Sequence, residues 1–185
     1  YNSTVCTAIV TVVDNIAPIA ICQDVTVQLD ANGNGSTTAV LVDNGSNDAC
    51  ELDTMTVSPN AFDCSNLNAN TVTLTVTDVN GNTQTCTAVV TVLDTLDPVA
   101  ICADITVNLD SASGEYTLTS LDSTNIVSTS SDNCSFVATF TPSEFDCDDV
   151  FAAVPVMVFL TDPSNNTDTC TALVTVNDVT DPTPA

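Results

Sequence analysis

Two residue types in this chain could do chemistry, aspartate and cysteine. The sequence carries 24 acidic residues and no Lys, Arg or His, which gives a formal net charge of −24. Glu occurs only at Glu51, Glu115 and Glu144, so almost all of the acids are Asp. A short carboxylate suits tight turns and hard cations such as Ca²⁺, which takes oxygen ligands. We therefore expect bound Ca²⁺ where Asp residues gather; the alternative is that the acidity only keeps a surface protein soluble.

The absence of basic residues excludes several functions. Nothing in the chain could neutralise the phosphates of a nucleic acid or the surface of an anionic membrane. No His or Lys could act as a base near neutral pH, and no Arg could stabilise an oxyanion. A pair of carboxylates could hydrolyse a glycoside, but with no Trp and only two Tyr the chain has little to hold a sugar. We expect no enzymatic activity, and no insertion into a membrane, because no apolar run approaches the length of a span.

Nine cysteines indicate disulfide bonds. Zinc is a poor explanation for them, since there is no His and no Cys-x-x-Cys motif. Disulfides persist in oxidising compartments, so we expect a secreted or cell-surface protein.

An internal repeat organises the chain. Thr85–Val92 recurs as Thr169–Val176 and has an earlier copy at Val5–Val12. Each copy is followed by a linker that begins with Asp and ends with Pro: Asp14 to Pro18, Asp94 to Pro98, and Asp178 to Pro182. A repeat of this length corresponds to one small domain. The expected divisions are 1–14 as the last strand of a preceding repeat, 15–94 and 95–178 as two whole repeats, and 179–185 as a linker to a following repeat of the same longer chain.

The cysteines keep step with the repeat, four to each unit. Four cysteines allow three pairings. We favour a long bond that ties the first strand to the last and a short bond that closes a local loop. The expected bonds are Cys22–Cys86 with Cys50–Cys64, and Cys102–Cys170 with Cys134–Cys147. Cys6 is then left for a partner before residue 1.

Alternation of apolar residues with Thr predicts β-strands. Thr71–Thr77 has one apolar face and one Thr face. The Asn80-Gly81 pair then predicts a hairpin, with Thr83–Leu93 as the return strand. Val25–Leu29 and Ile105–Leu109 are expected first strands, and no segment shows helical periodicity. The predicted fold is all-β: tandem immunoglobulin-like antiparallel sandwiches, each of about seven strands and stapled by disulfides.

These motifs resemble the hyalin repeat (HYR) family, in the Asp- and Thr-rich form found in long surface proteins of Bacteroidota-type bacteria. The likeness is carried by Cys-x-Asp-(Val/Ile)-Thr-Val at 22–27 and 102–107, Asp-(Ala/Asn)-Cys at 48–50 and 132–134, Thr-Asp-Val-Asn-Gly-Asn-x-x-x-Cys at 77–86, and Val-Thr-Val-x-Asp-x-x-x-Pro at 90–98. It covers residues 1–185 and implies an immunoglobulin-like or fibronectin-like fold in an extracellular adhesive or structural protein. Asp162–Asn166 departs from the pattern, because Asn replaces the turn Gly.

Strand direction in such a sandwich brings scattered acids together at the junctions between repeats. The linker, the loop before the Asp-(Ala/Asn)-Cys motif and the long hairpin turn should converge there. The expected Ca²⁺ ligands are Asp14, Asn15, Asp48, Asp78 and Asn80 at one junction, and Asp94, Asp97, Asp132, Asp162 and Asn165 at the next. Asp before a turn also caps backbone N–H groups without any metal, which is the competing explanation.

The expected function is that of a structural repeat in an extracellular stalk or filament, made rigid by disulfides and inter-repeat Ca²⁺ and able to form a homopolymer. The alternative is an adhesive module that binds a glycan or a surface protein through its loops. An exposed aromatic pair would favour this alternative. The aromatic residues that could supply one are Phe136, Phe140, Phe145, Phe151 and Phe159.

Overall fold

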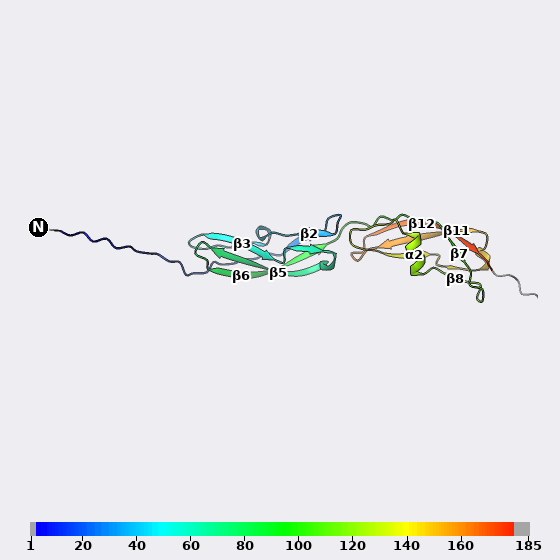
Figure 1. The fold of residues 1–185 in the computed structure, drawn as a ribbon, viewed down its shortest axis with the longest axis horizontal. Helices are drawn as coiled ribbons and strands as arrows, with labels where there is room; N and C mark the ends of the chain where they lie inside the picture. The colour runs from blue at the N-terminus through cyan, green and yellow to red at the C-terminus, as the bar shows by residue number, and fades with distance from the viewer. Residues whose placement is uncertain (1–2, 180–185) are drawn as a thin grey trace, which may run out of the picture. The chain divides into compact units, whose positions relative to one another are not determined.

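The computed structural model describes residues 3–179 and divides the chain into two compact units. The first unit comprises the chain up to Val27 together with Gly35–Leu93, and the second comprises Asp94 onward together with Gln28–Asn34. Each unit contains a four-stranded sheet and a two-stranded sheet. Figure 1 shows the strands of each unit as arrows. This is the immunoglobulin-like β-sandwich expected from the sequence.

The main sheet of the first unit has the strand order β1-β6-β5-β3, and its small sheet pairs β2 with β4. The elements of this unit are β1 (Val25–Gln28), β2 (Asn34–Ser36), α1 (Ala39–Val42), β3 (Leu52–Ser58), β4 (Ala61–Asp63), the 3₁₀-helix η1 (Cys64–Asn66), β5 (Asn68–Asp78) and β6 (Thr83–Leu93). The hairpin of β5 and β6 is antiparallel, with Thr77 opposite Thr83 and Asn68 opposite Val92.

Strict alternation along β5 and β6 builds the first core. Val72, Leu74 and Val76 of β5 are fully buried, as are Val90 and Val92 of β6, to within 1% exposure. The Thr residues between them lie on the other face and remain partly accessible. The strand and the return strand predicted from this alternation are therefore confirmed.

The second unit repeats this plan, with a main sheet in the order β7-β12-β11-β9 and a small sheet of β8 and β10. Its elements are β7 (Ile105–Asn108), β8 (Tyr116–Thr117), α2 (Ser120–Ile126), β9 (Val137–Thr141), β10 (Glu144–Phe145), η2 (Cys147–Asp149), β11 (Ala153–Thr161) and β12 (Thr167–Asn177). The first strand, β7, runs parallel to β12, whereas β11 pairs with β9 and β12 antiparallel. Val156, Val158 and Leu160 of β11 form the centre of its core.

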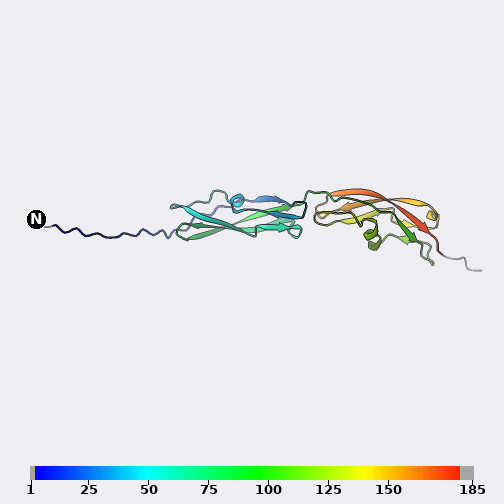
Figure 2. The ribbon, with the colours of Figure 1, turned by 45° about the horizontal axis from the view of Figure 1, so that its top comes forward.

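The expectation that the chain has no helices is wrong, because each unit contains a short α-helix, α1 or α2. The helix α2 begins at an N-cap, Thr119, whose hydroxyl accepts from Leu121 N, and Asp122 accepts in return from the Thr119 N–H. Figure 2 shows α2 (lime green) outside the main sheet of its unit. Helices of one or two turns escape a search for 3.6-residue periodicity, because they hold too few apolar positions to show a period. No helix of residues 3–179 is both long and apolar enough to cross a membrane.

Each unit has six named strands within the described residues rather than the seven expected. Short bridges, Ile19 with Asn47 and Val99 with Ser131, lie ahead of β1 and β7. Residues 3–18 form no strand, and Val5, Ile9, Val10 and Val12 along them are more than four-fifths exposed. Their assignment to a preceding repeat stays a prediction, and the expected linker 179–185 lies almost wholly outside the described residues.

The long disulfides form as predicted and the short ones do not. Cys22 is bonded to Cys86, and Cys102 to Cys170, so the segment before the first strand is tied to the last strand in both units. Cys50 and Cys147, in contrast, are free thiols. The expected bonds Cys50–Cys64 and Cys134–Cys147 are therefore wrong.

The short bonds were predicted wrongly because the prediction rested on distance along the sequence. Cys64 and Cys134 are each disulfide-bonded. Proximity in sequence favoured the short loops, yet a disulfide needs Cα atoms within about 7 Å and Cβ atoms that face each other, which spacing alone cannot reveal.

Candidate metal centre

Three carboxylates of the second unit meet at one point. Asp94 follows β6 at the start of the linker, Asp132 lies in the loop before β9, and Asp162 directly follows β11. Each offers one oxygen, and these oxygens all lie within 4.8 Å of one another. Asp94 is 5% exposed and Asp162 is 4% exposed. Two of the three acids are therefore almost completely removed from water.

A tight turn holds Asp162 in place. Its Oδ1 accepts from the Asn166 N–H at 2.7 Å, and its Oδ2 accepts from Asn166 Nδ2 at 2.8 Å. The same amide nitrogen also donates to the Asp94 carbonyl oxygen at 3.2 Å, so Asn166 joins the linker to the hairpin turn. Asn165 adopts φ 70, the left-handed conformation that Gly81 (φ 88) takes in the first unit. Asn tolerates this region, so the turn keeps its geometry although it has lost its glycine.

Two carboxylate oxygens of this cluster have no hydrogen-bond partner. Asp94 Oδ1 accepts from Leu96 N at 3.2 Å and from Asn133 Nδ2 at 3.0 Å, but Asp94 Oδ2 is buried and unpaired. Asp132 Oδ2 accepts from Cys134 N and Ser135 N, both at 2.9 Å, while Asp132 Oδ1 is buried and unpaired.

A buried carboxylate without a partner is costly, and the cost rises when others are close. Two like charges about 4 Å apart repel by about 1 kcal/mol in water and by several times more where water is excluded. The chain has no Lys, Arg or His to offset this. Three carboxylates with oxygens within 4.8 Å of one another, two of them with an unpaired oxygen, and no thiolate or imidazole among them fit a hard divalent cation such as Ca²⁺.

In the first unit the residues that correspond in sequence are Asp14, Asp48 and Asp78, of which Asp14 and Asp48 have oxygens close together. Asp78 is 1% exposed, and it accepts from the N–H groups of Asn80 (2.9 Å) and Asn82 (2.8 Å). Asn82 Nδ2 donates both to Asp78 Oδ2 at 2.7 Å and to the Asp14 carbonyl oxygen at 3.2 Å, as Asn166 does in the second unit. Although burial opposes its ionisation, the hydrogen bonds from Asn82, Asn80 and Gly81 hold the pKa of Asp78 below its usual range.

A thiol enters the cluster of the first unit. Ligand atoms of Asp14, Asp48 and Cys50 lie within 4.8 Å of one another, and Asp14 Oδ2 is buried without a partner. The hydrogen bond and the charge of Asp14, together with burial and the charges of Asp48 and Asp78, raise the pKa of the Cys50 thiol.

The structure separates the predicted ligands into two groups. It brings together Asp14 and Asp48 in the first unit, with Asp78 beside them, and Asp94, Asp132 and Asp162 in the second. The remaining predicted ligands are exposed: Asn15, Asn80, Asp97 and Asn165. Asp97 is not among the three carboxylates that gather in the second unit, and Asn80 and Asn165 belong to the two hairpin turns.

Sequence reasoning missed the amides that support both clusters, Asn82 and Asn166. A signal for them was present: each lies four residues after the turn Asp, so Asp-x-x-x-Asn is common to both repeats. Asn80 is not part of this shared pattern, because Ser164 takes its place.

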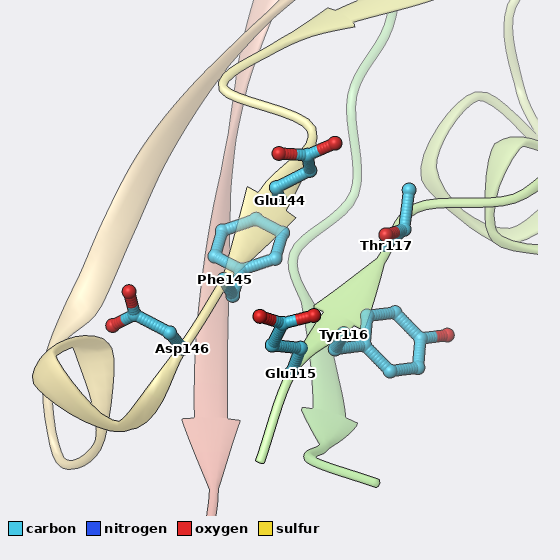
Figure 3. A pocket seen from close by; sticks show the side chains of 6 residues that line it. All are labelled: Glu115, Tyr116, Thr117, Glu144, Phe145 and Asp146. Atoms are coloured by element: carbon cyan, nitrogen blue, oxygen red, sulfur yellow. The ribbon is translucent and has the colours of Figure 1, made fainter. Parts of the chain in front are cut away.

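A shallow pocket in the second unit offers a different acidic surface. Figure 3 shows the residues that line it, Glu115, Tyr116 and Thr117 from one strand segment and Glu144, Phe145 and Asp146 from the neighbouring one. Phe145 is only 2% exposed and belongs to the core, and the Tyr116 hydroxyl donates to both oxygens of Asp122 at 2.9 Å. Because Phe145 is buried in the core and the Tyr116 hydroxyl is hydrogen-bonded to Asp122, the pocket presents mainly exposed carboxylates to a ligand.

The phenylalanines of the second unit do not form an exposed pair. Phe136 and Phe140 pack partly against the core, and Phe145 lies inside it. Phe151 is 96% exposed and Phe159 is 37% exposed. Phe151 precedes β11 and Phe159 lies near the far end of that strand, so most of the strand's length separates them.

Comparisons with known proteins show a distant likeness. No protein-family model matches the chain, and no curated protein matches it. Among solved structures it is similar to extracellular cadherin domains 1–4 of protocadherin gamma B7, at 14% identity and a TM-score of 0.34, covering 88% of this chain and 51% of that one. It is also similar to human protocadherin-24 EC1-2, at 13% identity and a TM-score of 0.36, covering 89% of this chain and 99% of that one.

A third similar structure is human mucin-like protocadherin EC1-2, at 12% identity and a TM-score of 0.36, covering 88% and 98% of the two chains. The chain thus spans about half the length of the first of these proteins, at 51%. No conclusion about function follows from likeness at this level.

Proposed function

We propose that this chain is part of an extracellular stalk or filament built from tandem hyalin-like repeats, and that Ca²⁺ stiffens the junctions between repeats. Residues 15–94 and 95–178 are the two repeats of this proposal. The observation that carries it is Asp94 Oδ2, which is buried without a partner beside the carboxylates of Asp132 and Asp162. Ca²⁺ would relieve their mutual repulsion, which no side chain of this sequence can do.

The position of the cluster links the ion to stiffness. Asp94 begins the linker that ends at the buried Pro98, and Pro fixes one backbone torsion. An ion bound by the linker, a loop and a hairpin turn would connect three segments that otherwise move separately. Asp14 and Pro18 stand in the same relation to the first unit, which supports one design used at successive junctions.

The disulfides support the extracellular and structural parts of the proposal. Cys22–Cys86 and Cys102–Cys170 close loops of 64 and 68 residues, and bonds of this kind stabilise small domains by about 2–4 kcal/mol. Such bonds persist outside reducing compartments. The adhesive alternative would need a receptive surface, and Phe151, the one strongly exposed aromatic side chain among residues 3–179, gives it little support.

Calorimetric titration with Ca²⁺ tests the proposal. The heat of each Ca²⁺ injection into the wild-type chain should fall to zero as the sites saturate. Asp94→Asn should lose the site of the second unit. Asp148→Asn is the matched control, because it removes the same charge from an exposed residue of the same unit outside the cluster. Equal binding by the two variants would refute the proposed site.

A further inference from the structure

Four of the five cysteines outside the long disulfides, all except Cys6, fall into two structural classes. Cys50 and Cys134, here called loop cysteines, each donate a backbone N–H to the Asp two residues before, at 2.8 Å to Asp48 and 2.9 Å to Asp132. Cys64 and Cys147, here called turn cysteines, are each the first residue of a 3₁₀-helix, η1 or η2.

The turn cysteines share their capping as well. Asp63 caps η1 and Asp146 caps η2, each in a reciprocal capping box with the third residue of the helix. The N-cap backbone angles also agree, at φ −138 and ψ −171 for Asp63 and φ −139 and ψ −168 for Asp146. The members of a class therefore occupy the same local structure in the two units.

The oxidation state nevertheless differs within each class. Cys134 is disulfide-bonded, but its equivalent Cys50 is an exposed free thiol. Cys64 is disulfide-bonded, but its equivalent Cys147 is an exposed free thiol. The same local structure thus carries a disulfide in one unit and a free thiol in the other.

The loop and turn cysteines of one repeat do not bond to each other. In the first unit Cys64 is bonded while Cys50 is free, and in the second Cys134 is bonded while Cys147 is free. The other two cysteines of each repeat are already joined in the long disulfides. The free thiols Cys50 and Cys147 therefore find no partner within their own repeats.

We propose that Cys50 and Cys147 are covalent linkage sites, at which the turn cysteine of one repeat forms a disulfide with the loop cysteine of a different repeat of the same kind. Of these four cysteines the two free thiols are one of each class, so Cys147 of one copy can bond to Cys50 of a second copy. Repetition of this bond joins copies head to tail into a covalent polymer. The inference deepens the proposed stalk or filament but does not depend on Ca²⁺.

The chemistry is thiol–disulfide exchange, and it balances with an acceptor disulfide such as oxidised glutathione. The Cys147 thiolate attacks the acceptor, forms a mixed disulfide and releases one glutathione thiol. The Cys50 thiolate of the second copy then attacks the Cys147 sulfur and releases the second glutathione. Two protein thiols lose two protons and two electrons, and one acceptor disulfide becomes two thiols.

Oxidation in solution tests the proposal. A Cys6→Ser background removes the third exposed thiol, and a chelator keeps Ca²⁺ out of the experiment, so that failure here leaves the calcium proposal untouched. In a glutathione buffer this protein should give a ladder of oligomers on a non-reducing gel, and mass spectrometry should find the Cys50–Cys147 peptide in large excess over the two symmetrical peptides. Adding Cys50→Ser or Cys147→Ser should abolish the ladder, and mixing those two variants should give dimers and nothing larger.

A displaced thiol is the matched control. Ser128→Cys, added to the Cys6→Ser and Cys50→Ser variant, restores two exposed thiols with one of them at an unrelated surface position. This variant should stay monomeric, and an unchanged melting temperature would show that each variant is folded. A ladder from the control equal to that of the parent, symmetrical peptides in statistical amounts, or no oligomers from the parent would each overturn the proposal.

Discussion

Many Asp side chains of this protein are satisfied by the backbone and not by a cation. Asp30 accepts from the N–H groups of Asn34 and Asn32, and Asp110 accepts from those of Ser113 and Ala112. These hydrogen bonds lower the pKa of both carboxyl groups. The turn-capping explanation therefore holds at these positions, and the unpaired oxygen of Asp94 is what separates the candidate metal centre from them.

Asp122 gives the first prediction, on pH dependence. Burial raises its pKa, but hydrogen bonds from the N–H and hydroxyl of Thr119 and from the Tyr116 hydroxyl outweigh this and lower it below the ordinary value of 3.8. Because the folded pKa is the lower one, the unfolded chain takes up the proton first, and this part of the stability is lost as the pH falls from about 5 through the folded pKa.

Asp122→Asn should therefore be less stable than the wild type at pH 7 and should lose less stability on acidification. Urea unfolding followed by circular dichroism from pH 7 to pH 3 measures both effects. Asp148→Asn, at an exposed carboxylate, should leave the acid limb unchanged. A parallel acid limb for Asp122→Asn and the wild type would contradict the assignment.

The hairpin turns give a second residue-scale prediction. Gly81 has φ +88, and a Cβ built there meets no atom within 4 Å, so a substitution is penalised by backbone strain alone. Gly81→Ala should destabilise the first unit by about 1–2 kcal/mol. Gly81→Asn should cost less, because Asn165 already adopts this conformation in the second unit. Chemical denaturation measures the free energy of unfolding of the two variants. Equal decreases for both would show that asparagine has no conformational advantage over alanine at this position.

At the scale of elements, burial within one strand predicts the cost of truncation. Leu160 of β11 is fully buried, whereas Met157 of the same strand is 48% exposed. Leu160→Ala should lower the free energy of unfolding by about 2–5 kcal/mol, since it leaves a cavity in a packed core. Met157→Ala is the control and should cost far less, although it removes a side chain of similar size. Similar losses for both would place the core on the wrong face of the sheet.

Strands were more predictable than turns and bonds. The alternation of Thr with Val and Leu over Thr71–Thr77 gave both the strand and its buried face, because a period of two is set by the backbone itself. The bounds of β6, Thr83–Leu93, also follow from the sequence. The helix α2 could not be predicted this way, since its start depends on the Thr119 cap and its packing on Ile126 in the distant core.

The candidate site was predictable as far as strand order and turn position determine it. Asp94, Asp132 and Asp162 converge because each stands at the end of a strand or in the loop beside one. The supporting amide Asn166 and the burial of Asp94 Oδ2 depend on side-chain packing, which no local pattern reports. The states of Cys50 and Cys147 were missed for the same reason.

At the scale of the whole molecule, the charge is the dominant fact. A net charge of −24 with no basic residue means that all formal charges on the side chains repel one another. Dissolved salt screens this repulsion between exposed groups over about 10 Å at 0.1 M, without regard to the identity of the cation. A specific site must therefore be distinguished from screening, and only the buried carboxylates offer such a distinction.

The most direct measurement is thermal unfolding in Ca²⁺, in Mg²⁺ and in a chelator, all at the same ionic strength. A cation that binds only the folded state adds RT ln(1 + [L]/Kd), or about 2.7 kcal/mol at a hundred times Kd. If the buried carboxylates bind Ca²⁺, the melting temperature should be several degrees higher in Ca²⁺ than in the other two solutions. Asp94→Asn should remove that difference. A melting temperature that is the same in all three solutions would contradict it.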